Sequence, residues 1–210
     1  MKKSVIIKVS LIVLFIAFLS TSAMATTTQV LNQDTYFYPP NNNNMMYFKA
    51  GTTVSLDNNG KVLSGTVAQQ YYLYNKGSMQ LLIKADTVVE FNNKGNATKA
   101  TLGAQWCFYF KPTNNYIYFK DSSVVIFDND YNVLSGTTAL NYFALPPKAV
   151  NPLNFKENTM ANFNSDGYII SGTLSADANL LGPNGENYYF RAGNMVVFDA
   201  NGRVKNQPQL

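Results

Sequence analysis

The stretch Phe155-Lys-Glu-Asn-Thr-Met-Ala-Asn-Phe163-Asn-Ser-Asp-Gly167-Tyr-Ile-Ile-Ser-Gly172-Thr-Leu174 carries the pattern on which the fold depends. Its apolar anchors recur with a period of two on both sides of Asn164-Ser-Asp-Gly167, which predicts strands that turn one face toward a core. Asx residues open tight turns through side-chain to backbone hydrogen bonds, and Gly supplies the positive φ that such a turn requires. The stretch therefore predicts a β-hairpin.

The same pattern recurs every 35 or 36 residues along the chain. The leading apolar residue of each copy is Phe48, Ile83, Phe119, Phe155 or Phe190. Recurrence at a fixed period is the signature of a repeat architecture. We therefore predict a single domain over residues 26–210, with five units centred on hairpins at 47–67, 82–102, 118–138, 154–174 and 189–206.

Each unit is expected to hold a strand such as Phe190 to Phe198, a turn, a second strand, and a short aromatic strand such as Phe108-Tyr-Phe-Lys-Pro112. Gly65, Gly136 and Gly172 recur in the middle of the second strand. A mid-strand Gly indicates either a bulge or a backbone that another layer approaches closely. Tyr131 stands where the other turns carry Gly, so the turn at 128–131 is expected to be the least regular.

These features predict an all-β fold, because no stretch after residue 25 has a convincing helical period. The hairpins are expected to lie side by side in an open or rolled repeat sheet. A closed barrel-like or propeller-like ring is the alternative, because an aromatic element precedes the first hairpin and the chain ends after the last one. Such a split of one unit between the two ends is typical of closed propellers.

Residues 1–25 are predicted to be a secretory signal peptide. Lys2, Lys3 and Lys8 precede an apolar run from Leu11 to Leu19, and Ala23-Met24-Ala25 has the form of a cleavage site. The protein is therefore expected in the periplasm, on the cell surface or outside the cell, with no transmembrane span in the mature form.

Loss of the signal peptide also changes the charge of the protein. Three of the 16 basic residues lie in the predicted signal, so 13 remain against 12 acidic ones, a net charge of +1. A nearly neutral chain gives no support to nucleic acid as a partner.

The unit F-K-A-G-T-x-V-x-[FL]-[DN]-x-x-G-x-V-x-S-G-T-[LV] is clearest at Phe48 to Val67 and at Phe155 to Leu174. It resembles tandem repeats of exported bacterial proteins and is distantly similar to the β-hairpin MORN repeats. Unlike this unit, the MORN unit is about 23 residues long and lacks the aromatic insert. The resemblance covers nearly all of the chain after residue 25 and implies hairpins side by side, with a binding or envelope role.

The residue inventory excludes several kinds of chemistry. The chain has no histidine, which excludes Ser-His-Asp and Cys-His catalysis and histidine-ligated metals. Its one cysteine, Cys107, cannot form a thiolate metal site. Turns such as Asp57-Asn-Asn-Gly60 faintly resemble calcium loops, but turn chemistry already explains each of their residues. We therefore predict no catalytic residues, no metal site and no cofactor.

Two sets of residues are candidates for ligand binding. The first is a basic column, one residue per hairpin, expected to face solvent: Lys49, Lys84, Lys120, Lys156 and Arg191. Stacked hairpins would align these charges for an acidic polysaccharide or lipid headgroups, although lysine on strands also blocks edge-to-edge aggregation. The second set, Tyr72, Trp106 and Tyr109, offers rings on which sugars stack, although such rings are more often core.

The sequence thus predicts an exported, non-enzymatic β-repeat protein that binds or builds part of the cell envelope or the extracellular space. A polysaccharide or another envelope component is the expected partner. Two alternatives stay open: a glycan-active enzyme that uses paired carboxylates, and a surface protein that self-assembles through open sheet edges.

Overall fold

The structure is a computed structural model, and it describes residues 26–74 and 80–208. The predicted signal peptide lies outside these residues. The described chain is nearly all β-structure, with a single 3-10 turn, η1 (Lys111–Thr113), as its helical element. The prediction of an all-β fold is therefore confirmed.

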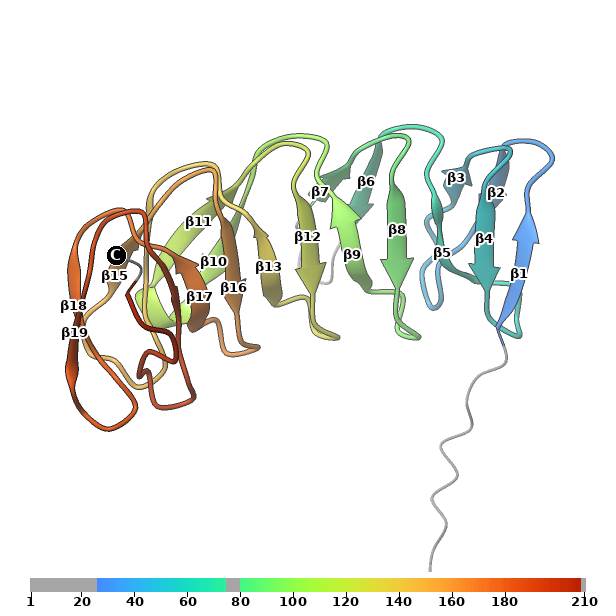
Figure 1. The fold of residues 1–210 in the computed structure, drawn as a ribbon. Coiled ribbons are helices and arrows are strands. Elements are labelled where there is room, and N and C mark those ends of the chain that lie inside the picture. Colours follow the sequence, from blue (N-terminus) through green and yellow to red (C-terminus); the bar gives the residue numbers. More distant parts are fainter. Residues whose placement is uncertain (1–25, 75–79, 209–210) are drawn as a thin grey trace, which may run out of the picture.

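One long antiparallel sheet runs the length of the molecule and forms its first layer (Figure 1). In spatial order its ten strands are β1 (Thr27–Val30), β4 (Thr53–Leu56), β5 (Val62–Thr66), β8 (Val88–Phe91), β9 (Ala97–Thr101), β12 (Val124–Phe127), β13 (Val133–Thr137), β16 (Met160–Phe163), β17 (Ile169–Thr173) and β20 (Met195–Val197). β1 and β20 are its two edges and do not pair with each other. The sheet is open, and the chain does not form the alternative closed ring.

A second layer of separate two-stranded hairpins covers one face of the long sheet (Figure 1). These hairpins are β2 (Thr35–Phe37) with β3 (Met46–Phe48), β6 (Tyr71–Tyr74) with β7 (Gln80–Ile83), β10 (Trp106–Phe110) with β11 (Asn115–Phe119), β14 (Tyr142–Ala144) with β15 (Leu153–Phe155), and β18 (Ala178–Leu181) with β19 (Asn187–Phe190). The predicted aromatic strands are the first strands of these hairpins. The hydrophobic core fills the space between the two layers.

The first strand of each predicted unit differs from expectation, because a tight turn divides it in two. The segment expected as one strand from Phe190 to Phe198 is β19 in the second layer and β20 in the long sheet. The chain changes layer at a residue with positive φ, namely Gly51, Asp86, Ser122, Asn158 or Gly193. Gly, Asx and Ser all favour turns, so these residues carried a turn signal that the period-two pattern concealed. We call these segments the corner turns.

The turns inside the long sheet have the predicted chemistry. The Oδ1 atom of Asp57 accepts the backbone N–H groups of Asn59 and Lys61, both at 2.8 Å, and Gly60 has φ +71°. Tyr131 occupies the Gly position of its turn with φ +69°. Its hydroxyl accepts the backbone N–H of Ala97 at 3.0 Å, which offsets the backbone strain.

The mid-strand glycines lie where the second layer touches the long sheet. A Cβ atom at Gly65, Gly136 or Gly172 would come within 2.6–2.8 Å of a ring carbon of Phe48, Phe119 or Phe155, respectively. The expectation of a close approach by another layer is thus confirmed. In the remaining hairpin Ala100 holds this register position, and the leading residue is the smaller Ile83.

Candidate functional site

The basic column lies on the corner turns rather than on strands. Lys49 Nζ forms an ion pair with Asp86, the positive-φ residue of the next corner turn. Lys84 Nζ donates to Ser122 Oγ, the corresponding residue one turn further, at 2.5 Å. The first three corner turns are therefore linked through lysine side chains. Exposed links of this kind contribute about 0–1 kcal/mol each.

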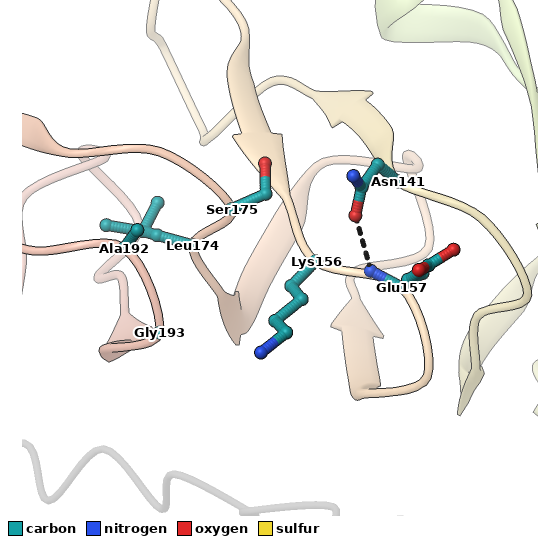
Figure 2. A pocket seen from close by; sticks show the side chains of 7 residues that line it. All are labelled: Asn141, Lys156, Glu157, Leu174, Ser175, Ala192 and Gly193. Atoms are coloured by element: carbon teal, nitrogen blue, oxygen red, sulfur yellow. Dashed lines mark hydrogen bonds between the residues drawn. The ribbon is translucent and has the colours of Figure 1, made fainter.

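A shallow pocket of about 260 Å³ lies between the last two corner turns (Figure 2). Gly193 takes the place of Asp86 and Ser122 in the last corner turn, so this position offers Lys156 no acceptor side chain. Glu157 also lines the pocket, and its backbone N–H donates to Asn141 Oδ1 at 2.8 Å (Figure 2). Carboxylates therefore lie beside members of the basic column at the Lys49–Asp86 ion pair and next to Lys156 at this pocket.

The three aromatic candidates do not share one face. Tyr72 and Tyr109 point outward from the second layer, and each is 49% exposed. Trp106 lies on the inward face of β10, the same face as the buried Phe108 and Phe110, and packs half-buried against the core. Its indole N–H is buried without a hydrogen-bond partner among the described residues. The structure therefore brings Tyr72 and Tyr109 to one surface and places Trp106 beneath it.

Further aromatic rings accompany Tyr72 and Tyr109 on the outward face of the second layer. We call the complete set the outer aromatic strip: Tyr36, Tyr47, Tyr72, Tyr109, Tyr116, Tyr118, Phe143 and Tyr189. It extends over all the hairpins of this layer, because inward residues alternate with outward ones on each strand. Sequence reasoning missed most of these rings. Their signal was the position just before the leading apolar residue, where Tyr47, Tyr118 and Tyr189 stand.

Neighbouring groups hold several of these rings in place. The rings of Tyr36 and Tyr47 stack with centroids 4.2 Å apart, and the Tyr109 hydroxyl bonds with Asn114 Oδ1 at 2.7 Å. Tyr189 donates its hydroxyl to the carboxylate of Asp177. This hydrogen bond lowers the pKa of Asp177 and raises the pKa of Tyr189, because it favours the protonated phenol beside an ionised carboxylate.

A groove of about 970 Å³ opens beside Tyr109, next to two turns of the long sheet, those at 128–131 and 164–167. Its polar and aromatic lining includes Tyr109, Lys111, Asp130, Tyr131, Asp166 and Tyr168. The groove is thus continuous with the outer aromatic strip at Tyr109. Its size and mixed lining are typical of a site for a small ligand or part of a longer chain.

The groove exists because the β10–β11 hairpin leans over the next turn along the sheet. Phe110 packs on Phe163 with ring centroids 4.4 Å apart, and the ring of Pro112 closes over Gly167. The space above the turn at 128–131 is left open. At the turns that end before Val62, Ile169 and Val204, a carbonyl of the overlying segment accepts the first strand N–H.

The equivalent N–H of Val133 lies on the groove wall and, within the described part of the chain, donates to no carbonyl of the overlying segment.

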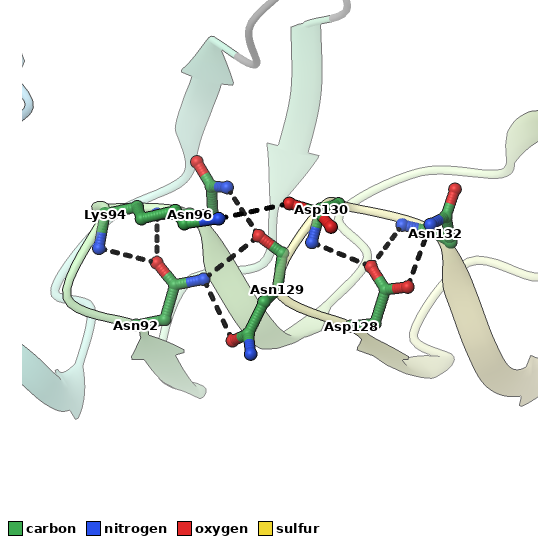
Figure 3. A network of polar contacts seen from close by, with 7 residues as sticks. All are labelled: Asn92, Lys94, Asn96, Asp128, Asn129, Asp130 and Asn132. Carbon is green, nitrogen blue, oxygen red and sulfur yellow. Dashed lines mark hydrogen bonds and ion pairs between the residues drawn. The ribbon is translucent and has the colours of Figure 1, made fainter. Parts of the chain in front are cut away.

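A polar network fixes one wall of the groove (Figure 3). The side-chain amides of Asn92 and Asn96 donate to the backbone carbonyl of Asn129 at 3.3 and 2.8 Å, and Lys94 Nζ pairs with Asp130 at 3.2 Å (Figure 3). Asp130 is therefore positioned by the preceding turn. Of the two carboxylates that line the groove, Asp130 and Asp166, Asp130 is thus ion-paired.

No family model matches the sequence, and no curated protein matches it. Within residues 26–74 and 80–208, no helix has the length and apolar character needed to cross a membrane. The same residues contain no cluster of three His, Cys, Asp or Glu side chains that could hold a metal ion.

Proposed function

We propose that this protein is an exported, non-enzymatic binding component of the cell envelope or extracellular space, and that its ligand is a polysaccharide. The ligand would lie along the outer aromatic strip and enter the groove at Tyr109. One observation carries this proposal: half-exposed rings occupy the outward face of hairpin after hairpin. Sugar rings present C–H groups that pack on aromatic faces, and tyrosine adds a hydroxyl that bonds to sugar hydroxyls.

The spacing of the rings supports an extended chain as the ligand. Neighbouring strands lie about 4.8 Å apart, and each second-layer hairpin covers two strands of the long sheet, so successive hairpins are about 10 Å apart. This spacing is close to the length of a disaccharide unit in an extended glycan. One chain could therefore meet a ring at regular intervals without bending sharply.

Binding to a panel of neutral and acidic polysaccharides tests the proposal. We expect Tyr72→Ala, Tyr109→Ala and Tyr189→Ala each to weaken binding roughly fivefold to tenfold, since one stacked ring contributes about 1 kcal/mol. Met160→Ala is a matched control, because Met160 is 51% exposed but lies on the long sheet. If no polysaccharide of the panel binds, or if the tyrosine variants bind like the wild type, the proposal is wrong.

The basic column is tested separately with the triple variant Lys84→Gln, Lys120→Gln and Lys156→Gln. We expect this variant to bind neutral polysaccharides as the wild type does. A selective loss of acidic polysaccharides would show that the column, rather than the strip, recognises the ligand.

A glycan-active enzyme is the second candidate function, because Asp130 and Asp166 both line the groove. Paired carboxylates catalyse glycoside hydrolysis when one donates a proton and the other attacks or activates water. The test is whether the protein releases new reducing ends from the same polysaccharide panel. Release by the wild type that is lost in Asp130→Asn and in Asp166→Asn would favour the enzyme over the binding proposal.

A further inference from the structure

The two edges of the long sheet differ in how their backbone groups are satisfied. At β20 the chain folds back on itself, and the side chain of Asn206 acts as a substitute strand. Its Oδ1 accepts the N–H of Val197 at 2.9 Å, and its Nδ2 donates to the carbonyl of Met195 at 2.8 Å. The N–H of Lys205 donates to the carbonyl of Val197 at 2.8 Å. This edge is capped.

The opposite edge, β1, has no such cap among the described residues. Leu31 exchanges hydrogen bonds with the corner turn before β4, and Gln29 lies opposite Val54. Hydrogen-bonded and non-bonded positions alternate along an antiparallel pair. The N–H and C=O groups of Thr28 and Val30 therefore point away from β4, into solvent.

The residues of this open edge lack the usual protection against pairing. Native edge strands are commonly blocked by charged residues, proline or bulges. Residues 26–31 read Thr-Thr-Thr-Gln-Val-Leu, with no charged side chain and no proline. All four residues of β1 are exposed, and Val30 is 63% exposed.

We propose that β1 pairs antiparallel with β1 of a second copy of this chain, around a twofold axis at Gln29. In this register Thr28 lies opposite Val30 of the second copy, and the outward groups of both residues form four backbone hydrogen bonds across the interface. The paired side chains are β-branched and uncharged, a favourable cross-strand combination. The edge is therefore complementary to itself.

The cap at β20 makes this assembly end at a dimer. A twofold contact uses the same surface on both copies, and the capped edges remain at the two outer ends of the joined sheet. A four-residue edge buries less than the roughly 1,200–2,000 Å² of a typical stable interface, so the dimer is expected to dissociate on dilution. This contact is independent of the proposed polysaccharide ligand.

Sedimentation of the purified protein over a range of concentrations tests the dimer. The protein is produced from the 210-residue sequence and allowed to undergo export. We expect a reversible monomer–dimer equilibrium that Thr28→Pro abolishes, because proline removes an outward N–H that β4 does not use. Thr28→Val keeps this N–H and the β-branched shape, and is expected to dimerise like the wild type. Thermal melts confirm that both variants fold.

A cysteine scan tests the register in a Cys107→Ser background. Residues directly opposite in a non-hydrogen-bonded pair have Cβ atoms about 4.5–5.5 Å apart, close enough for a disulfide after a small adjustment. Gln29→Cys is therefore expected to form a covalent dimer on mild oxidation, and Val30→Cys is not. A monomer at all concentrations, a dimer that persists in Thr28→Pro, or cross-linking at position 30 instead of 29 would each overturn the proposal.

Discussion

The contact between Gly136 and Phe119 shows how tightly the two layers fit. Phe119 is fully buried, and a Cβ atom added at Gly136 would lie 2.6 Å from its Cδ1 and 2.9 Å from its Cε1. Real Cβ atoms essentially never approach another heavy atom within 3.0 Å. Gly136→Ala must therefore push the ring or the strand aside.

The expected loss follows from two opposing effects. Overpacking of a buried site costs about 1–3 kcal/mol, and restricting the unfolded chain by Gly→Ala returns about 0.4–1 kcal/mol. We therefore expect Gly136→Ala to lower the free energy of unfolding by roughly 1–2 kcal/mol. For a chain of this length, the melting temperature should fall by about 2–8 °C.

The hairpin that contains Ala100 suggests how to reverse this loss. In this unit Ala100 replaces the mid-strand glycine, and Ile83 replaces the phenylalanine that packs on it. The larger residue in the long sheet is thus matched by a smaller residue in the second layer. Phe119→Ile alone should cost about 1–3 kcal/mol, because it leaves a cavity. In the double variant, which carries both Gly136→Ala and Phe119→Ile, the methyl group of the new alanine fills part of that cavity. The double variant should be at least about 1 kcal/mol more stable than the sum of the single effects predicts.

Urea unfolding of the four proteins measures this coupling directly. Ser135→Ala, one residue away on the same strand, is the control and should change stability by less than about 0.5 kcal/mol. Additive effects in the double variant, or an unchanged stability of Gly136→Ala, would refute the idea that the second layer selects glycine here.

Three further predictions concern the cap, the irregular turn and acid stability. Asn206→Ala frees the N–H of Val197, so light scattering should detect particles larger than the wild-type assembly; an unchanged size would contradict the capping role. Tyr131→Phe leaves the N–H of Ala97 unpaired and should destabilise the protein by about 1–3 kcal/mol in urea unfolding. The backbone N–H of Arg203 is the main cause of the lowered pKa of Asp199, so the stability that this carboxylate adds is present at neutral pH and is lost as the pH falls below about 4. Asp199→Asn, which keeps a turn-forming residue, should show a smaller loss of stability on acidification, measured as the melting temperature at pH 7 and pH 3.

Local signals were sufficient to predict the hairpins of the long sheet. The Asx-to-Gly turns and the period of two act over a few residues and are visible in a single stretch such as Phe155 to Leu174. The recurrence every 35 or 36 residues then repeats this local pattern along the chain. The mid-strand glycines predicted either a bulge or a close second layer. The structure shows the close layer, because only a missing side chain permits such an approach.

The corner turns show where the local pattern failed. The residues from Phe190 to Phe198 keep a period-two appearance across the turn at Gly193, because both flanking strands face the same core from opposite layers. Periodicity alone does not distinguish one strand from two strands that fold over each other. The basic column was consequently expected on strands, although it lies on corner turns.

The sequence by itself determined that this chain forms β-hairpins, where they turn and which residues anchor them, since these depend on neighbours along the chain. Only the tertiary structure decided which tyrosines share the outward face, where the groove opens and which sheet edge stays uncapped. Those features depend on how one hairpin leans on the next and on side chains far apart in sequence, such as Pro112 over Gly167. Contacts of that kind leave no periodic signal, because each occurs once.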